Sequence, residues 1–193
     1  GYDLTTDLDH RPAARQFRRS LFRYAGSQAF RPMAELPLAW VQSRCGVAGL
    51  RRLGAKVVSV DSEDRANGNL AANILDGDPT TFWHTRWQPQ NDPMPHELIV
   101  DLGREMTLRG ITCLPRQDQA NGRIAEAVVL ASTRLGEWGD PVARLRGRNG
   151  TELITLEFVQ PVNVRFLRLA VRSEINGQPF ASLAELDILA VNP

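Results

Sequence analysis

The chain has 193 residues, 42% of them hydrophobic, which is enough for one ordinary domain with a sizeable core plus an appendage. Its 23 Lys and Arg residues against 22 Asp and Glu residues give a formal net charge of +1, which leaves no basic footprint for nucleic acid. The apolar runs are too short to span a bilayer, so we expect neither a membrane nor a nucleic-acid partner.

Residues 1–54 are predicted to be helical and irregular. The polar start GYDLTTDLDHR has no signal peptide and no Met, which indicates a fragment or a processed product. Pro12 stands in the first turn of a predicted helix and Gly26 just past its end. Its apolar stripe is formed by Ala14, Phe17, Leu21 and Tyr24, and elsewhere on the wheel lie Arg15, Arg18, Arg19 and Arg23. We interpret it as an amphipathic helix that packs on a neighbouring domain; the alternative is an arginine role at a membrane surface or on nucleic acid.

A Pro-containing stretch from Arg31 to Pro37 is predicted to be a linker, and from about Ala55 the hydrophobic period changes to two. The predicted strands of residues 55–193 are Lys56–Val60, Glu97–Leu102, Leu108–Leu114, Ala127–Ser132, Leu153–Phe158, Val164–Arg172 and Leu183–Leu189. Asn-Gly and Asp-Gly turns separate many of these runs. About seven short strands without a helical pattern between them predict an all-β sandwich or jelly roll.

The loop from Asn73 to Thr81 is rich in oxygen donors around a tight Asp76-Gly77 turn, with Asp78 two residues on. Calcium takes six to eight oxygen ligands, including backbone carbonyls, so this loop is a candidate metal site. The alternative is an ordinary Asp-Gly turn without metal.

Four strings then resemble, in order, the discoidin fold of the coagulation factor V/VIII type C domain, and within it the carbohydrate-binding modules of family 32: NILDGDPTTFWHT, LIVDLG, LPRQDQANGRI and SLAELDILA. The resemblance covers residues 55–190 and implies a discoidin-like jelly-roll β-sandwich, preceded here by the short helical segment. It also implies a structural calcium ion held by the equivalents of the Asn73 carbonyl, Asp76, Asp78, Thr81, the Ala184 carbonyl and Glu185.

Three polar residues outside the acidic loop are candidates for sugar binding: His84, Arg116 and Asn121. Together they offer a planar fork of donors, an amide and an imidazole for vicinal hydroxyls. In galactose-binding members of the resembled family a His, an Arg and an Asn contact the sugar and an aromatic ring stacks on it, which implies Phe180 as the aromatic residue. Trp87 or Trp138 is the alternative platform. The structural alternatives are a hairpin turn at Asn121, a buried histidine and a core aromatic.

A catalytic role is not expected for this chain. The sequence has no Gly-x-Ser-x-Gly elbow and no His-Glu-x-x-His motif. Its best-placed carboxylates, Asp76, Asp78 and Glu185, belong to the expected metal site. The two cysteines, Cys45 and Cys113, fit either one bridge or two buried thiols.

The first thirty or so residues resemble the C-terminal trailer of large bacterial glycosidases of the family 2 type. This implies catalytic domains upstream in the same polypeptide and a secreted or periplasmic location. We therefore expect a non-catalytic module that targets a glycosidase to galactose- or N-acetylhexosamine-containing glycans. A docking module without sugar binding is the second hypothesis, and a discoidin-type protein or lipid binder is the third.

Overall fold

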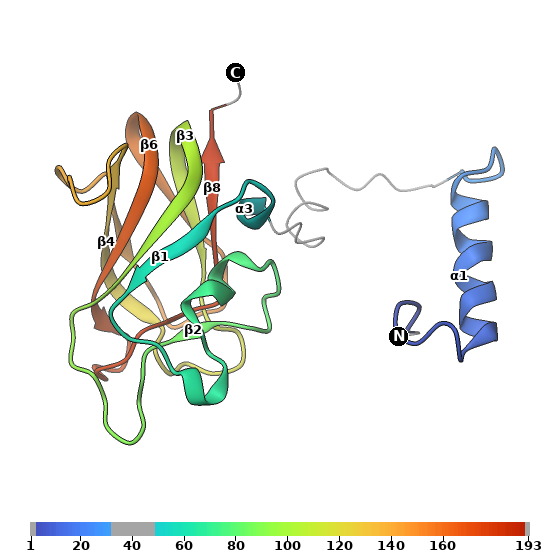
Figure 1. Ribbon diagram of the computed structural model, residues 1–193, viewed down its shortest axis with the longest axis horizontal. Coiled ribbons are helices and arrows are strands. Elements are labelled where there is room, and N and C mark those ends of the chain that lie inside the picture. The colour runs from blue at the N-terminus through green and yellow to red at the C-terminus, as the bar shows by residue number, and fades with distance from the viewer. Residues whose placement is uncertain (1–2, 32–48, 192–193) are drawn as a thin grey trace. The chain divides into compact units, whose positions relative to one another are not determined.

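The computed structural model describes residues 3–31 and 49–191, and the chain forms two compact units, residues 1–44 and residues 45–193 (Figure 1). In the second unit, Leu50 of the short helix α3 (Gly49–Arg52) is only 2% exposed and belongs to the core. The boundary expected after residue 54 stays a prediction. Residues 32–37 of the expected linker lie outside the described residues.

In the first unit, the predicted helix is confirmed as α1 (Pro12–Ala25). Pro12 occupies the first turn, and the Gly26 N–H donates to the Phe22 carbonyl 3.0 Å away at the end of the helix. The Arg11 guanidinium bonds the Asp3 carboxylate at 2.9 Å and so fixes the segment that enters the helix. Within the described ranges, no helix is both long enough and apolar enough to cross a membrane.

The second unit is an all-β jelly-roll sandwich, as predicted. Its elements in chain order after α3 are β1 (Lys56–Val60), η1 (Arg65–Asn67), η2 (Ala71–Leu75), β2 (Trp83–His84), β3 (His96–Leu114), β4 (Ile124–Ser132), β5 (Ala143–Arg146), β6 (Ile154–Glu174), β7 (Ser182–Leu183) and β8 (Glu185–Ala190). Strands β2 and β5 were not expected from the sequence. Strand β2 is too short to show alternation, and β5 buries a single apolar side chain, Leu145.

Two long strands build both layers of the sandwich. The first half of β3 pairs with β1 and the second half of β6, whereas its second half pairs with β8 and the first half of β6. Between Asp101 and Met106 the pairing register is irregular, and both strands arch over one end of the sandwich (Figure 1). The sequence suggested four separate strands because polar residues interrupt the alternation at these arches.

The core is made by the alternate residues that the period of two singled out. On β3, Leu98 is 1% exposed and Val100 and Leu102 are fully buried. Trp83 is also fully buried, and its indole N–H donates to the Ser62 carbonyl at 2.9 Å. This bond ties β2 to the segment that leaves β1, and therefore fixes the loop end of the sandwich.

The described cysteine, Cys113 on β3, carries a free and fully buried thiol. Burial raises the pKa of this thiol to about 12, so it is an inert core residue. Cys45 lies outside the described residues.

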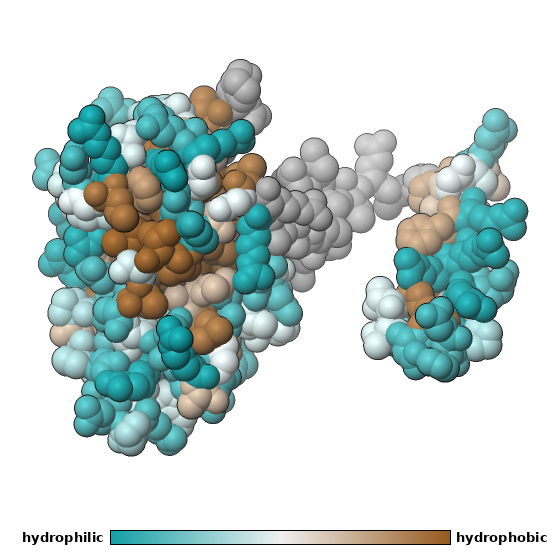
Figure 2. Space-filling view, viewed as in Figure 1, coloured by the Kyte–Doolittle hydropathy of each residue, from teal (hydrophilic) through white to brown (hydrophobic). Residues whose placement is uncertain are grey.

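Apolar residues also gather on one outer face of the second unit, over β1 and the adjacent part of β3, with hydrophilic residues around them (Figure 2). Val58 of β1 is 37% exposed there, whereas Ile99 and Phe166 on the neighbouring strands are less than a tenth exposed. The Arg165 guanidinium lies 5.1 Å from the centre of the Phe166 ring and pairs with Asp101. Part of this apolar surface is therefore flanked by a charged side chain of the same sheet.

The close approach of β4 and β5 gives the first prediction. A Cβ atom on Gly147 would lie 1.9 Å from the Ile124 carbonyl oxygen, whereas a Cβ atom on Gly139 would meet nothing within 4 Å. We expect Gly147→Ala to lower the free energy of unfolding by about 2–3 kcal/mol, because the backbone must move. Urea denaturation measures this, with Gly139→Ala as the matched control. Equal stability of the two variants would contradict the geometry.

Candidate functional site

Three segments that are distant in sequence meet beside β2 at the loop end of the sandwich. His84 is paired with Ser182 of β7, and the Asp64 N–H donates to the His84 carbonyl at 2.8 Å. The Ser182 hydroxyl in turn donates to the Asn121 carbonyl at 3.0 Å. We call this junction of residues 64, 84, 116, 121 and 180–182 the rim.

His84 lies at the centre of the rim and is only 4% exposed. Its Nδ1 is 2.6 Å from the Thr85 carbonyl, so Nδ1 carries the proton and Nε2 is left as an acceptor. Burial lowers the pKa of His84, the Thr85 hydrogen bond opposes this, and the charge of Arg116 adds to the lowering. The ring is therefore neutral near pH 7 and offers one lone pair at its edge.

Arg116 and Phe180 supply the donors and the aromatic face of the rim. The Phe180 ring is half-buried, with its centre 5.6 Å from that of His84 at an angle of 37°. Arg116 donates to Asp118 through Nε at 2.6 Å and Nη2 at 2.9 Å, and its guanidinium lies 4.0 Å from the centre of the Phe82 ring. These contacts hold the guanidinium in one orientation.

Asn121 completes the rim, and its residue is exposed. Its carbonyl is anchored by Ser182, so its side chain projects from a fixed turn. The structure therefore brings His84, Arg116, Asn121 and Phe180 to one end of the sandwich. Sequence analysis missed Asp118, Phe82 and Ser182; only the Arg-x-Asp spacing was a usable signal for the first of these.

The two alternative aromatic platforms are in different surroundings. Trp87 is 42% exposed, and its indole N–H donates to the Asp64 carboxylate at 3.1 Å, next to the rim. Trp138 instead faces Arg168 of β6 at 5.9 Å, on the sheet. Of these two, only Trp87 shares a hydrogen-bonding partner with the rim.

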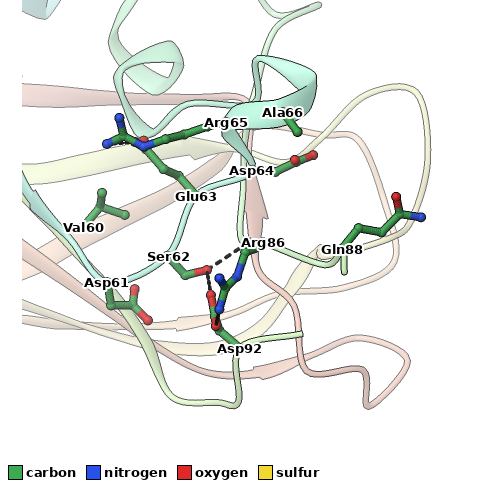
Figure 3. Close-up of a pocket in the computed structure, with 10 residues that line it drawn as sticks. All are labelled: Val60, Asp61, Ser62, Glu63, Asp64, Arg65, Ala66, Arg86, Gln88 and Asp92. Carbon is green, nitrogen blue, oxygen red and sulfur yellow. Dashed lines mark hydrogen bonds and ion pairs between the residues drawn. The ribbon is translucent and has the colours of Figure 1, made fainter. Parts of the chain in front are cut away.

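A polar pocket of about 430 Å³ is lined by residues 60–66, Arg86, Gln88 and Asp92, and it shares Asp64 with the rim (Figure 3). Ser62 and Arg86 both bind Asp92, and the Arg65 guanidinium lies 2.7 Å from Glu63. Asp64 lines the pocket and also binds Trp87. Arg65 and Arg86 each have an ionic partner within the pocket, although Arg86 Nε is buried without a hydrogen-bond partner among the described residues.

The acidic loop and the last strand also converge. The Glu185 Oε2 atom accepts the Gly77 N–H at 3.3 Å, and Thr81 donates its hydroxyl to Asp76 at 2.8 Å. The Glu185 Oε1 atom is buried and has no hydrogen-bond partner in the described part of the chain. Burial, together with the negative charge of Asp76, raises the pKa of Glu185 to about 8. Two facing carboxylates and an orphaned oxygen are a donor set that suits a hard cation.

The other expected metal ligands, Asn73, Asp78 and Ala184, each contact a different partner. The Asn73 carbonyl accepts the Asp76 N–H at 3.2 Å, and Ala184, between β7 and β8, donates its N–H to Leu114. The Asp78 carboxylate points to Thr80, whose N–H it accepts at 2.9 Å. Among the described residues, no three His, Cys, Asp or Glu side chains gather as a metal cluster. Any cation here would therefore depend on backbone carbonyls as well as on Asp76 and Glu185.

Comparison with known families decides the fold family. The model of the F5/8 type C domain matches residues 57–186, about two thirds of the chain. The chain belongs to the F5/8 type C domain family. Residues 1–45 separately match a domain of unknown function, DUF8487.

Two solved structures are similar to this chain over about three quarters of its length. One is CpGH89CBM32-5 from Clostridium perfringens in complex with GalNAc-β-1,3-galactose, with a TM-score of 0.66, 27% identity, and coverage of 73% of this chain and 99% of that one. The other is the family 32 carbohydrate-binding module of C. perfringens NanJ in complex with galactose, with a TM-score of 0.62, 27% identity, and coverage of 72% and 96%. The discoidin-like fold expected from the sequence is thus confirmed.

Two longer proteins contain a similar F5/8 type C segment. The sialidase of Micromonospora viridifaciens is 37% identical over 135 residues, 68% of this chain and 21% of that protein. A galactose oxidase of Gibberella zeae is 34% identical over 134 residues, 67% of this chain and 19% of that protein. The chain therefore spans about a fifth of the length of these relatives.

The second prediction concerns Asp64, which is 3% exposed and accepts hydrogen bonds from Asn67, Asn69 and Trp87. Burial opposes ionisation, but these donors outweigh it and the pKa of Asp64 is lowered. We expect Asp64→Asn to lower the free energy of unfolding at pH 7 by about 1–3 kcal/mol. Because the folded-state pKa is depressed, the carboxylate stabilises the fold above its unfolded-state pKa, and this gain disappears as pH falls through the folded-state value.

Chemical denaturation between pH 7 and about pH 2 tests this, since the difference from wild type should shrink on acidification. The control is Asp140→Asn, at an exposed loop position. A constant difference across the pH range would argue against the role of the Asp64 charge.

Proposed function

We propose that the second unit is a non-catalytic carbohydrate-binding module whose ligands are galactose- or N-acetylhexosamine-containing glycans. The observation that carries the proposal is the convergence of His84, Asn121 and Phe180 around Ser182, with Arg116 on the Phe82 ring and close enough for its charge to act on His84. The similarity to modules solved with galactose and with GalNAc-β-1,3-galactose supports the same ligand class.

Each rim residue makes a different kind of contact with one bound pyranose ring. The Nε2 edge of neutral His84 accepts a hydroxyl proton. The Nη1 group of Arg116, which does not bond Asp118, and the Asn121 amide supply donors to neighbouring hydroxyls. Phe180 covers the C–H face of the ring. Since His84 is 4% exposed, only its ring edge reaches the sugar, and the site is a shallow contact. One stacked ring with a few hydrogen bonds gives an affinity of roughly micromolar to millimolar.

The carboxylates at the rim already accept hydrogen bonds from other side chains, which supports sugar binding rather than catalysis. Asp118 is engaged by Arg116, and Asp64 by two amides and an indole. Glycoside hydrolysis needs two carboxyl groups free to act across one bond. The rim offers hydroxyl recognition instead, so any reaction belongs to another part of the parent protein.

We also propose a structural calcium ion at the junction of the acidic loop and β8. Its ligands are the carboxylates of Asp76 and Glu185, the Thr81 hydroxyl, and the carbonyls of Asn73, Asp78 and Ala184. The support is the buried, unpartnered Glu185 Oε1 and the closeness of the two like charges. Bound calcium would stabilise the folded module by joining the loop to the last strand.

The parent protein is proposed to be a secreted or periplasmic bacterial glycoside hydrolase, possessing catalytic domains upstream of Gly1. The support is that the similar sialidase is about five times as long as the matched segment, because that segment is 21% of it. In such a protein the module raises the local concentration of the catalytic domain at its glycan.

The third prediction tests sugar binding through the geometry of Arg116. Arg116→Lys keeps the charge but removes the planar fork, so we expect at least about a tenfold loss of affinity for methyl β-galactoside. The control is Arg109→Lys, since Arg109 lies on β3 beside Glu157 and outside the rim. Isothermal titration or a glycan array measures both.

Saturable binding by wild type and by the Arg109 variant, lost in the Arg116 variant, is the expected pattern. Failure of all three proteins to bind any galactose- or N-acetylhexosamine-containing glycan would refute the proposal and favour the docking module. Equal binding by all three proteins would show that Arg116 is not part of the sugar-binding site.

The fourth prediction tests the ion. Extended treatment with chelator is expected to lower the melting temperature of wild type by about 5 °C, because two facing carboxylates lose their shared cation. Glu185→Gln should respond less to calcium, and in chelator near pH 7 should melt no lower than wild type, because the amide is uncharged, as is the Glu185 carboxyl with its pKa of about 8. Glu137→Gln, at an exposed loop position, serves as the control. A wild-type melting curve that is identical with calcium and with chelator would count against the ion.

A further inference from the structure

We propose that His96 is a positioning residue for the sugar site: in its protonated form it holds the loop of Phe180 against the rim, so that galactoside binding is strongest within a limited pH range. This inference rests on the proposed sugar-binding function and adds its regulation by pH.

His96 is the first residue of β3 and is completely buried. Its Nδ1 lies 2.7 Å from the Asp61 carboxylate, and its Nε2 lies 3.0 Å from the Pro179 carbonyl. Both partners are acceptors, whereas a neutral imidazole has only one N–H to donate. Both hydrogen bonds can therefore form at once only when the ring is an imidazolium ion.

The surroundings of His96 favour that charged form. Asp61 is itself held in place, because its second oxygen accepts the Glu97 N–H at 2.8 Å. Burial lowers the pKa of His96, but the Asp61 and Pro179 hydrogen bonds and the charges of Asp61 and Asp92 outweigh burial, so the pKa is raised. His84 also interacts with His96 across this space, and its pKa is lowered, so it is neutral.

The Pro179 carbonyl directly precedes Phe180, so the His96 bond acts on the loop that presents the aromatic face. Beyond Phe180 the chain is fixed by Ala181, whose N–H donates to the Thr85 hydroxyl at 3.0 Å. Before Pro179 it is fixed by Glu174, which accepts the Gln178 N–H at 3.0 Å. His96 supplies the contact between these two anchors. When His96 loses one proton, the remaining N–H stays on Nδ1 with the Asp61 carboxylate, because a charged acceptor forms the stronger hydrogen bond. The Pro179 carbonyl then loses its donor, and Phe180 gains freedom that sugar binding must remove.

His84 therefore limits sugar binding at acidic pH, and His96 limits it at alkaline pH. His84 must be neutral to accept a hydroxyl proton, and its lowered pKa places the loss of that acceptor on the acidic side. His96 must be protonated, and its raised pKa places the loss of the loop contact on the alkaline side. We expect a bell-shaped dependence of affinity on pH, with macroscopic midpoints because the two rings interact.

The experiment is a titration of the full chain with methyl β-galactoside in saturating calcium, from about pH 5 to about pH 9. Wild type is expected to bind about fivefold more weakly at the alkaline end than at its optimum, as fits the loss of one charge-assisted hydrogen bond. His96→Gln, which cannot titrate, should lose this alkaline limb. His10→Gln is the matched control, since His10 is exposed in the first unit beside Asp7.

The outcomes separate this inference from the proposed function. Binding that is equally strong across the alkaline range, or an alkaline limb that persists in His96→Gln, overturns the role of His96 and leaves sugar binding intact. Absence of binding at every pH overturns sugar binding itself. If His96→Gln does not fold, NMR of the wild-type protein tests the proposal by showing how many ring nitrogens of His96 carry a proton. Both should carry protons at pH 7, and a single N–H on His96 overturns the proposal.

Discussion

The two-residue pairing of β2 with β7 is the constraint on which the candidate site depends. It sets His84 opposite Ser182, and Ser182 then reaches the Asn121 turn through its hydroxyl. Trp83, the other residue of β2, anchors this short ladder in the core through its buried indole. A core side chain and a site side chain thus alternate on the same strand, so the packing of the sandwich directly positions the rim.

The polar groups at this end of the sandwich are arranged in pairs, and their partners determine which of them can act. Arg116 is oriented by Asp118 and Phe82, and His96 by Asp61 and Pro179. Two buried atoms in the described part of the chain have no hydrogen-bond partner, Arg86 Nε and Glu185 Oε1, and the second faces another carboxylate across the acidic loop. This contrast between satisfied and unsatisfied groups is the basis for proposing hydroxyl recognition at the rim and a cation at the loop.

Much of the fold could be predicted from the sequence because alternation of buried residues is a local signal. Residues such as Leu98 and Val100 revealed a strand, and Pro12 and Gly26 delimited the helix. The continuity of β3 and β6 could not be predicted, since a strand that changes layers looks like two strands. The candidate site residues were found through family strings. The Ser182 contact with Asn121 and the two hydrogen bonds of His96 join residues 35 to 83 positions apart, which no local spacing shows.

The central claim is that residues far apart in sequence form one shallow surface that binds a pyranose. An NMR titration of the full chain with methyl β-galactoside tests it most directly. The account predicts saturable amide shifts confined to the neighbourhood of His84, Arg116, Asn121 and Phe180. Saturable shifts centred on another surface, or none at millimolar sugar, would contradict it.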